Sequence, residues 1–432
     1  MATVASARWP KRMLVCTSRW TMSSAFRHKE NSMLSAPLIC RLHAGSNLIH
    51  GREQKVTLAG ARTLWSWGSA DHGRGGSGGH TDAPIFEVIQ KEPEKVEKPV
   101  LPAKLIKKVA CGGAHSMIVT ESGRLLTCGL NDNGQLGLGN LENASEFEEV
   151  KGTESIADVA AGFWHTLAAS KKGKLYAWGS NKHGQLGHHD TAVKLAVEPQ
   201  EILLLRDAPI KQVACGSYHS MALTKDGEVY TWGFGAHGRL GHGSTEDEFM
   251  PKRVEALVGE NISSIHAGFE YSSAVSTSGK VFVWGYGHFY VLGQGDKKDQ
   301  LAPVVLDFPT SIRQLAFGSF HAAAVSHSGM LFTWGHATHG PLGHGLKSPN
   351  IILEPTVLDA PAQLQNSKQV ACGSQHTLVV TGTGDVFSFG LGGQGQLGLG
   401  SDLDHYEPKQ IPRFVGKSLR QVACGLFHCI GF

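Results

Sequence analysis

Seven positions share one spacing that repeatedly places an imidazole or phenol group. Each lies three residues after a glycine, and the set is His115, His165, His219, Tyr271, His321, His376 and His428. Imidazole changes charge near pH 6.5, so a ring of such groups could contact a protein partner or respond to pH. In the alternative, each histidine hydrogen-bonds the backbone of a neighbouring repeat unit. These residues are the first candidates for a partner-binding face.

One copy of the repeat, at residues 264 to 285, departs from the others. Tyr271 stands where the other copies have histidine, and Glu270 replaces the residue before it. Phe289 and Tyr290 lie in a loop that otherwise reads His-Gly-x-Leu. Residues that a fold does not require can mark a functional surface, although drift would also produce them. Aromatic side chains are common interface anchors. Glu270, Phe289 and Tyr290 therefore join the candidate face.

Other histidines and cysteines could suggest a metal. One set of histidines lies beside loop glycines, at His72, His183, His237, His339, His188, His242 and His344. Equivalent positions of different units lie too far apart to share a metal at bond lengths of about 2 Å, so we expect turn roles. Four cysteines precede an anchoring glycine, at Cys111, Cys215, Cys372 and Cys424, without a disulfide or zinc spacing. We expect no metal and no cofactor.

Catalytic signatures do not stand out from the repeat. The chain has no Ser/His/Asp order, paired-carboxylate motif or phosphate-binding loop. A tryptophan set instead predicts core packing, because Cys128 and Phe389 replace it in two copies; the set is Trp67, Trp178, Trp232, Trp284 and Trp334. The sequence predicts that the chain is not an enzyme.

The elements that position these residues come from an internal repeat. A phrase such as QVACGSYHSMALTKDGEVYTWG at 212 to 233 occurs in six copies 50 to 55 residues apart, a period typical of propellers and solenoids. Short β-branched and aromatic runs around a glycine turn indicate antiparallel hairpins. Prolines mark a further edge strand, at Pro199, Pro251, Pro303, Pro355 and Pro408. Four strands per copy predict a propeller blade.

The two ends complete a seventh unit. TLWSWG at 63 to 68 matches the second half of a copy, and QVACGLFHCIGF at 421 to 432 matches the first half. Six copies and two complementary halves predict an all-β, seven-bladed β-propeller with four-stranded antiparallel blades, closed by pairing its N- and C-terminal strands. Residues 61–432 form this domain, with a charged, proline-containing surface loop at 80–104.

The first sixty residues differ from the rest in charge. Nine Lys and Arg against Glu30 and Glu53 give this segment a charge of +7, and the remaining 31 basic and 35 acidic residues give −4. Residues 1–60 are Arg- and Ser-rich and acid-poor, which predicts a disordered mitochondrial transit peptide, with a nuclear or cytoplasmic location as the alternative. A mildly acidic body is a poor match to nucleic acid, so we expect no direct DNA binding by the propeller. No apolar run is long enough for a membrane span.

The repeated phrase resembles the regulator of chromosome condensation repeat family, and the resemblance covers residues 61–432. WGSNKHGQLG at 178 to 187 lies close to the family consensus. The resemblance implies a seven-bladed propeller that presents one face to protein partners. Family roles include nucleotide exchange on Ran, ubiquitin ligation, ciliary scaffolding, ultraviolet-B perception and mitochondrial RNA processing. In the exchange factor, the GTPase docks near the ring of seven positions.

Two specific family roles match poorly. The exchange factor requires a hairpin wedge, but residues 80–104 read as a solvated loop. The photoreceptor uses repeated Gly-Trp-Arg-His-Thr motifs, and here residues 162 to 166 hold a single variant, GFWHT, without the arginine.

We therefore expect a non-catalytic scaffold propeller in mitochondria, which engages a protein or ribonucleoprotein through one face. The alternative is a guanine-nucleotide exchange factor for a small GTPase.

Overall fold

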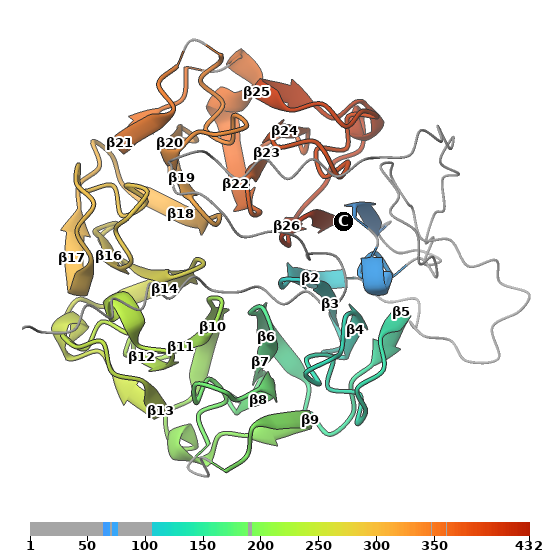
Figure 1. Ribbon diagram of the computed structural model, residues 1–432, viewed down its shortest axis with the longest axis vertical. Coiled ribbons are helices and arrows are strands. Elements are labelled where there is room, and N and C mark those ends of the chain that lie inside the picture. The colour runs from blue at the N-terminus through green and yellow to red at the C-terminus, as the bar shows by residue number, and fades with distance from the viewer. Residues whose placement is uncertain (1–63, 70, 77–105, 189–191, 347, 360) are drawn as a thin grey trace, which may run out of the picture. The chain divides into compact units, whose positions relative to one another are not determined.

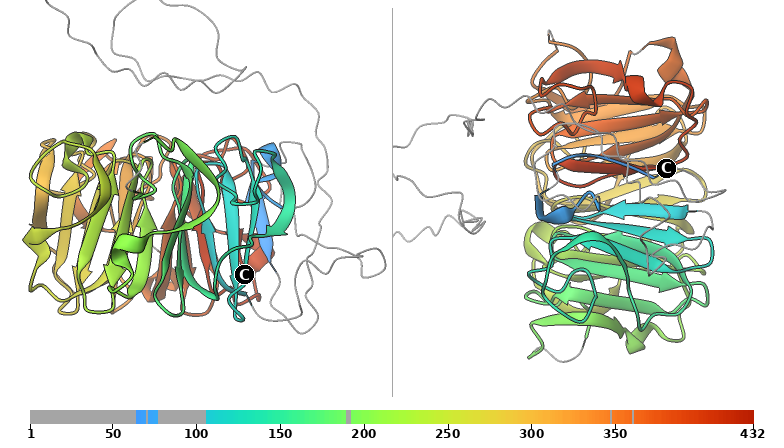
Figure 2. Two further views of the ribbon diagram at one scale, coloured as in Figure 1. Left: turned by 90° about the horizontal axis from the view of Figure 1, so that it is seen from below. Right: turned by 90° about the vertical axis from the view of Figure 1, so that its right-hand side faces the viewer.

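The computed structural model describes residues 64–69, 71–76, 106–188, 192–346, 348–359 and 361–432. Its strands form seven antiparallel sheets around a central axis (Figure 1). In side view, the strands of each sheet run between the two faces of the ring (Figure 2). The predicted all-β, seven-bladed propeller is confirmed. The predicted transit peptide at 1–60 and surface loop at 80–104 lie outside the described residues.

Six blades have four strands each, in sequence order from the channel outward. Blade 2 is β2 (Ile106–Cys111), β3 (His115–Thr120), β4 (Leu125–Gly129) and β5 (Ala144–Glu149). Blade 3 is β6 (Ile156–Ala161), β7 (His165–Ser170), β8 (Leu175–Ser180) and β9 (Leu195–Glu201). Blade 4 is β10 (Ile210–Cys215), β11 (His219–Thr224), β12 (Val229–Gly233) and β13 (Glu248–Arg253).

The next three blades repeat this order. Blade 5 is β14 (Ile262–Ala267), β15 (Tyr271–Ser276), β16 (Val281–Gly285) and β17 (Gln300–Leu306). Blade 6 is β18 (Ile312–Phe317), β19 (His321–Ser326), β20 (Leu331–His336) and β21 (Ile351–Val357). Blade 7 is β22 (Ser367–Cys372), β23 (His376–Thr381), β24 (Val386–Gly390) and β25 (His405–Gln410).

Blade 1 joins the two ends of the propeller. Its described part is β26 (Val422–Cys424), β27 (His428–Gly431) and β1 (Trp65–Gly68), in the order β1-β27-β26. Strand β1 pairs antiparallel with β27, and Trp67 faces Cys429 in the register. The predicted closure by N- and C-terminal strands is therefore confirmed. Among the described residues, this pairing places β27 between β26 and β1, so neither edge of β27 is left open.

Short 3-10 helices connect some of the strands. They are η1 (Asp71–Gly73), η3 (Leu203–Leu205), η4 (Ala236–Gly238), η5 (Glu255–Leu257), η6 (Ala362–Asn366) and η7 (Pro412–Phe414). Among the described residues, no helix is long and apolar enough to cross a membrane.

The outer strands hold the prolines that the sequence assigns to an edge. Pro199 lies within β9, beside the register shift between Ala177 and Gly179 of β8. Proline has no N–H for a ladder, so it fits an edge strand at an irregularity. The edge assignment is confirmed, but the prolines lie inside these strands and not at their start.

The hydrophobic core lies between the blades, and tryptophan side chains are among its largest members. Trp178, Trp232, Trp284 and Trp334 are fully buried, as the sequence predicts for packing residues. Each indole also donates to a carbonyl of the preceding blade, as from Trp232 Nε1 to the Gln185 oxygen at 2.9 Å. That hydrogen bond satisfies the only polar atom of the ring, which allows tryptophan to be buried in the core.

The second histidine set lies in turns, as predicted. His72, His237 and His339 have φ between 58° and 68°. The ring of His237 also bonds Asp299 of the next blade, with 2.7 Å between Nδ1 and Oδ2. These histidines link neighbouring loops and do not gather around one point.

Candidate partner-binding face

The seven glycine-spaced residues form a buried layer between blades. The rings of His115, His165, His219, Tyr271, His321, His376 and His428 are each exposed by 1% or less. Their backbone lies where the second strand of each blade begins. A partner cannot touch these side chains directly, so burial removes them from the surface on which the sequence had placed them.

Each histidine of the layer binds a hydroxyl or thiol of the following blade. His219 Nε2 lies 2.9 Å from Ser272 Oγ, and His376 Nε2 lies 3.1 Å from Cys429 Sγ. The other pairs are His115 with Thr166, His165 with Ser220, His321 with Thr377 and His428 with Ser116. The links between blades are therefore made to side chains, whereas the sequence alternative expected backbone partners. Because both partners are buried, loss of either leaves a buried polar atom unsatisfied.

The anchoring glycine explains why the spacing is fixed. A Cβ on Gly162 would lie 2.3 Å from Cε1 of His165 and 2.7 Å from the carbonyl oxygen of Gly216 in the next blade. Only hydrogen fits between the folded-back imidazole and the neighbouring backbone. The Gly-x-x-His phrase is thus the signature of contact between blades.

Tyr271 is the exception in this layer, and its neighbour explains it. The following blade has Ala322 at the position where others carry a hydroxyl or thiol. The tyrosine reaches past that position and donates its hydroxyl to the Gly318 carbonyl. Tyr271 therefore replaces one interblade link by another, and its departure from the repeat has a structural cause.

Burial also controls the charge of the layer. Desolvation lowers the pKa of His115 to about 4 and the pKa values of His165 and His321 to about 3. The pKa values of His219 and His428 also fall well below their ordinary value. These rings are neutral at physiological pH, so they do not provide a sensor near pH 6.5.

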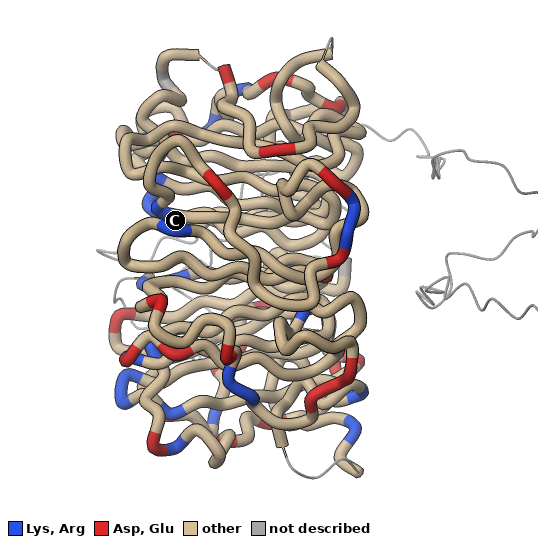
Figure 3. The backbone as a smooth tube through the Cα atoms, turned by 90° about the vertical axis from the view of Figure 1, so that its left-hand side faces the viewer, with Lys and Arg blue, Asp and Glu red and all other residues tan. Residues whose placement is uncertain are grey.

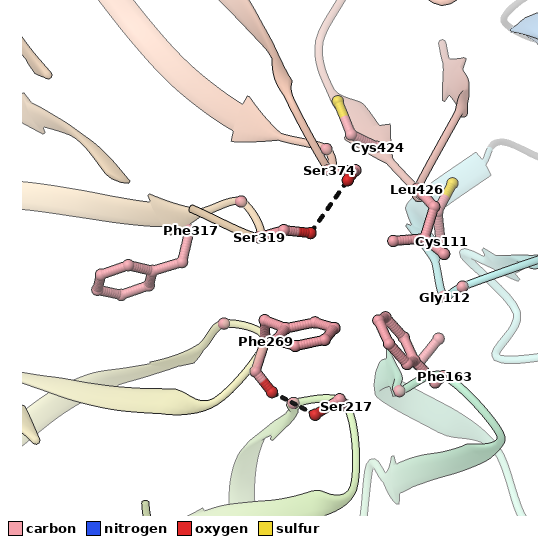
Figure 4. A pocket seen from close by; sticks show the side chains of 18 of the residues that line it. Cys111, Gly112, Phe163, Ser217, Phe269, Phe317, Ser319, Ser374, Cys424 and Leu426 are labelled. Carbon is pink, nitrogen blue, oxygen red and sulfur yellow. Dashed lines mark hydrogen bonds between the residues drawn. The ribbon is translucent and has the colours of Figure 1, made fainter. Parts of the chain in front are cut away.

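A cavity opens at the channel end beside this layer. Its volume is about 180 Å³, and residues around the anchoring glycines of all seven blades line it. Phe163 and Phe269 point into it, while Ser319 and Ser374 join across its wall at 3.1 Å between hydroxyl oxygens (Figure 4). Its lining contains no Asp, Glu, Lys, Arg or His. Such a site can accept an apolar group but offers no strong acid or base.

A set of partly exposed aromatic side chains includes two that line this cavity, Phe163 and Phe269. We call this set the aromatic belt, and it comprises Phe163, Trp164, Tyr218, Phe234, Phe269, Tyr286, Phe289 and Phe320. The ring centres of Phe163 and Phe269 lie 5.1 Å apart in an edge-to-face arrangement, and the ring centres of Phe289 and Phe320 lie 4.5 Å apart. Trp164 Nε1 donates to the Tyr218 hydroxyl at 3.4 Å. The rings pack against one another in these pairs and remain partly exposed.

The belt residues lie in blades 3 to 6, and of the equivalent positions in the other three blades one, Phe427 of blade 1, is aromatic. The other corresponding positions of blades 7, 1 and 2 carry small, aliphatic or amide residues, namely Ser374, Gln375, Leu391, Leu426, Ser69, Gly113, Ala114 and Leu130. The fold tolerates those residues, so it does not require the aromatic ones. Sequence analysis finds Phe289 but misses the others. Aligning the copies at one, two and eighteen residues after each anchoring glycine would reveal them.

Glu270 and Tyr290 lie beside the belt. The Glu270 carboxylate lies 3.5 Å from the guanidinium of Arg239, whose side chain is fully buried and whose carbon lies 4.7 Å from the Phe234 ring centre. Burial lowers the pKa of Arg239, and the Glu270 charge opposes that shift. The carboxylate therefore compensates a buried cation under the belt.

Tyr290 has an unusual backbone conformation. Its φ is 60°, at a loop position where the other blades have Gly73, Gly134, Gly184, Gly238, Gly340 and Gly395, all with positive φ. A bulky residue at positive φ is strained by about 1 to 3 kcal/mol. Lys297 lies 5.2 Å from its ring centre. Strain at a partly exposed tyrosine is the kind of local cost that binding surfaces carry.

Charge on the rim near β17 gives no continuous field. Basic and acidic positions lie close together on that side (Figure 3).

Comparisons with known proteins agree with this geometry. The family model described as RCC1-like domain matches residues 25–272. The model described as Regulator of chromosome condensation (RCC1) repeat matches residues 278–325, 328–380 and 383–431.

Two curated relatives share much of this chain. The Ultraviolet-B receptor UVR8 of Arabidopsis thaliana is 34% identical over 353 residues, 81% of this chain and 65% of the receptor. The Probable E3 ubiquitin-protein ligase HERC3 of Homo sapiens is 40% identical over 328 residues, 76% of this chain and 26% of the ligase. The chain thus spans just under two thirds of the first relative and about a quarter of the second.

Solved structures share the fold. Human WBSCR16 has a TM-score of 0.72 and 24% identity, with 85% of this chain and 98% of that chain covered. Prp20p from Saccharomyces cerevisiae has a TM-score of 0.74 and 23% identity, with 85% and 90% covered. At these identities the likeness concerns the fold alone.

Proposed function

The chain belongs to the RCC1-like domain family, and from that premise we propose that it is a non-catalytic scaffold that binds a protein partner through the aromatic belt. The observation that carries this proposal is the asymmetry of the channel face. Eight partly exposed aromatic side chains occupy blades 3 to 6, and the equivalent positions elsewhere are mostly small, aliphatic or amide residues. Aromatic side chains dominate the free energy of many protein interfaces.

The partner class follows from the chemistry of the belt. Its rings present apolar area next to a cavity without charged lining residues. The cavity offers no cationic side chain to a phosphate-rich ligand, whereas an apolar or aromatic segment of a protein can pack on the rings of the belt. We place this partner in mitochondria, because residues 1–60 have the composition of a transit peptide. A ribonucleoprotein could present such a protein surface.

A small GTPase is the second candidate partner. The propeller of Prp20p, which shares this fold, binds Gsp1p and histones. Exchange activity would require the belt to stabilise the nucleotide-free GTPase. It would involve no covalent step by this chain.

The belt is tested by a paired variant in cells and then with purified proteins. Proximity labelling with the full chain identifies candidate partners, and calorimetry with each purified candidate measures Kd. We expect Trp164→Ala with Phe289→Ala to weaken binding at least 30-fold, since hot-spot residues contribute about 2 kcal/mol or more. Gln375→Ala is the matched control, because Gln375 occupies the position of Trp164 in blade 7. If the paired variant and the Gln375→Ala control bind the partner with the same Kd, the belt is excluded as the binding surface.

Two further measurements separate the finer proposals. Fusion of residues 1–60 to a fluorescent reporter should direct it to mitochondria, and a cytosolic or nuclear reporter would refute the location. Faster release of labelled nucleotide from a purified GTPase would favour exchange activity. An unchanged rate of nucleotide release from a GTPase that binds the belt would refute exchange activity and retain the scaffold proposal.

A further inference from the structure

Two thiols and an imidazole meet where the ring closes. Cys424 of β26 and Cys429 of β27 are cross-strand partners, with their sulfur atoms 3.8 Å apart. His376 of β23 reaches in from blade 7, and its Nε2 lies 3.1 Å from Cys429 Sγ. One ligand atom from each of the three residues lies within 4.8 Å of the other two. Two thiols and an imidazole in this arrangement are potential metal ligands.

This combination occurs in one copy of the repeat. Cysteine precedes the anchoring glycine in four copies, but four residues after that glycine the other copies carry Ser116, Thr166, Ser220, Ser272, Ala322 and Thr377. Only the last copy has cysteine at both positions. A hydroxyl suffices for the interblade bond to histidine in other blades, so the interblade link does not require the second thiol.

Burial and access both suit a bound ion. Cys429 and His376 are fully buried, and Cys424 is partly exposed where it lines the cavity at the channel end (Figure 4). An ion can therefore approach through the channel mouth and first meet Cys424. His376 Nδ1 has no hydrogen-bond partner among the described residues.

We propose that His376, Cys424 and Cys429 bind a thiophilic d10 cation at the blade 7 to blade 1 seam. Three ligands around such an ion, with metal–sulfur bonds of about 2.3 Å, hold sulfur atoms about 4 Å apart. The 3.8 Å between the two sulfur atoms fits that requirement. The 3.1 Å contact of the imidazole would lengthen by about 0.5 Å to admit the ion.

Charge balance favours Zn(II) over Cu(I). Two thiolates and one neutral imidazole make a neutral complex with a divalent ion, whereas a monovalent ion would leave a buried negative charge. Three protein ligands and one water form an open zinc site, and the neighbouring cavity offers room for that water. Burial raises the pKa of both thiols. Zinc binding therefore releases two protons, one from each sulfur, with no change in oxidation state.

The test uses the reduced, metal-free full chain and Zn(II) in competition with a chromophoric chelator. We expect one equivalent to bind, with an affinity that falls by up to about 100-fold per unit decrease in pH because two protons are displaced. Co(II) added instead should give thiolate charge-transfer absorption. Cu(I) is titrated separately, and tighter Cu(I) binding by the same residues would keep the site but reverse the metal preference.

The repeat provides matched variants. Cys429→Ser installs the residue type of other blades, so it should fold and lose at least 100-fold in Zn(II) affinity. Cys215→Ser alters the equivalent of Cys424 in blade 4 and should leave the affinity unchanged. Ser220→Cys completes a second trio with Cys215 and His165, whose ring lies 3.1 Å from Ser220 Oγ, and should add a second equivalent.

Equal affinity of the wild type and Cys429→Ser for both metals would overturn the proposal. So would the absence of thiolate charge transfer with Co(II) in wild-type protein that has folded. This test is independent of the belt, because no belt residue is among the ligands.

Discussion

Adjacent positions of each repeat unit have opposite roles in this propeller. The third and fourth residues after each anchoring glycine form a buried layer that joins blades. The third residue is histidine in six of the seven copies, and the fourth is serine or threonine in five. The first and second residues face the channel end and vary from glycine to tryptophan. Tyr218 and His219 illustrate the contrast, since one is partly exposed and the next is fully buried. Uniformity among copies thus marks what closes the ring, and variation marks what the surface can present.

Lowering the pH should have the largest effect of the tests proposed here, because it destabilises the buried histidine layer. The pKa of His115 is lowered to about 4 in the folded chain and returns to about 6.5 on unfolding. The unfolded state then binds more protons, so the free energy of unfolding falls as pH drops from about 6.5 to about 4. Each such histidine removes about 1.4 kcal/mol per pH unit.

Urea unfolding from pH 8 to pH 4.5 measures this dependence. His165 and His321, with pKa values of about 3, add to the same slope. Together they should remove a large part of a total stability of about 5 to 15 kcal/mol. A free energy of unfolding that stays constant between pH 7 and pH 5 would contradict neutral burial of this layer.

Neighbouring alanine substitutions give the next largest effect. His219→Ala should lower the free energy of unfolding by about 2 to 4 kcal/mol, because it opens a cavity and leaves Ser272 without its imidazole partner. Tyr218→Ala, one residue earlier, should cost about 1 kcal/mol. Denaturant titration of both variants checks the difference. Similar losses would show that the two positions are not distinct in stability.

The exceptional link in blade 5 offers a smaller, coupled test. Tyr271→His should destabilise the chain by about 1 to 3 kcal/mol, since Ala322 offers the new ring no hydroxyl. Adding Ala322→Ser should recover about 1 kcal/mol or more through a bond like that between His219 and Ser272. A double-mutant cycle by thermal unfolding measures this coupling. Strict additivity would refute the compensation.

Tyr290→Gly should give the smallest change in stability and the opposite sign. Removing a strained tyrosine at φ 60° should raise the free energy of unfolding by up to about 1 kcal/mol. The same change should weaken partner binding if the strain serves the surface beside the belt. Chemical unfolding and calorimetry are measured on one preparation. A destabilised variant would show that the tyrosine is held there for packing.

Much of this architecture is local in origin and is therefore readable from the residues. Glycine at fixed offsets, β-branched runs and two complementary half-copies predict the blades, their number and the closure of β1 on β27. The tryptophans are correctly predicted as core residues, because a position that exchanges tryptophan for other apolar residues between copies is typical of core packing. The candidate face is predicted in part, since Phe289 lies in it and the histidine layer does not.

The number of blades follows from the amino-acid sequence, because the residues of each blade form one continuous stretch or, in blade 1, two complementary terminal segments. The packing of blades against one another determines which repeated residues are exposed, because the burial of His219 beside the partly exposed Tyr218 depends on the next blade. It also placed His376 against Cys429, 53 residues further along the chain. Contacts between blades join residues that no local spacing connects, and these contacts determine both the buried layer and the proposed metal site.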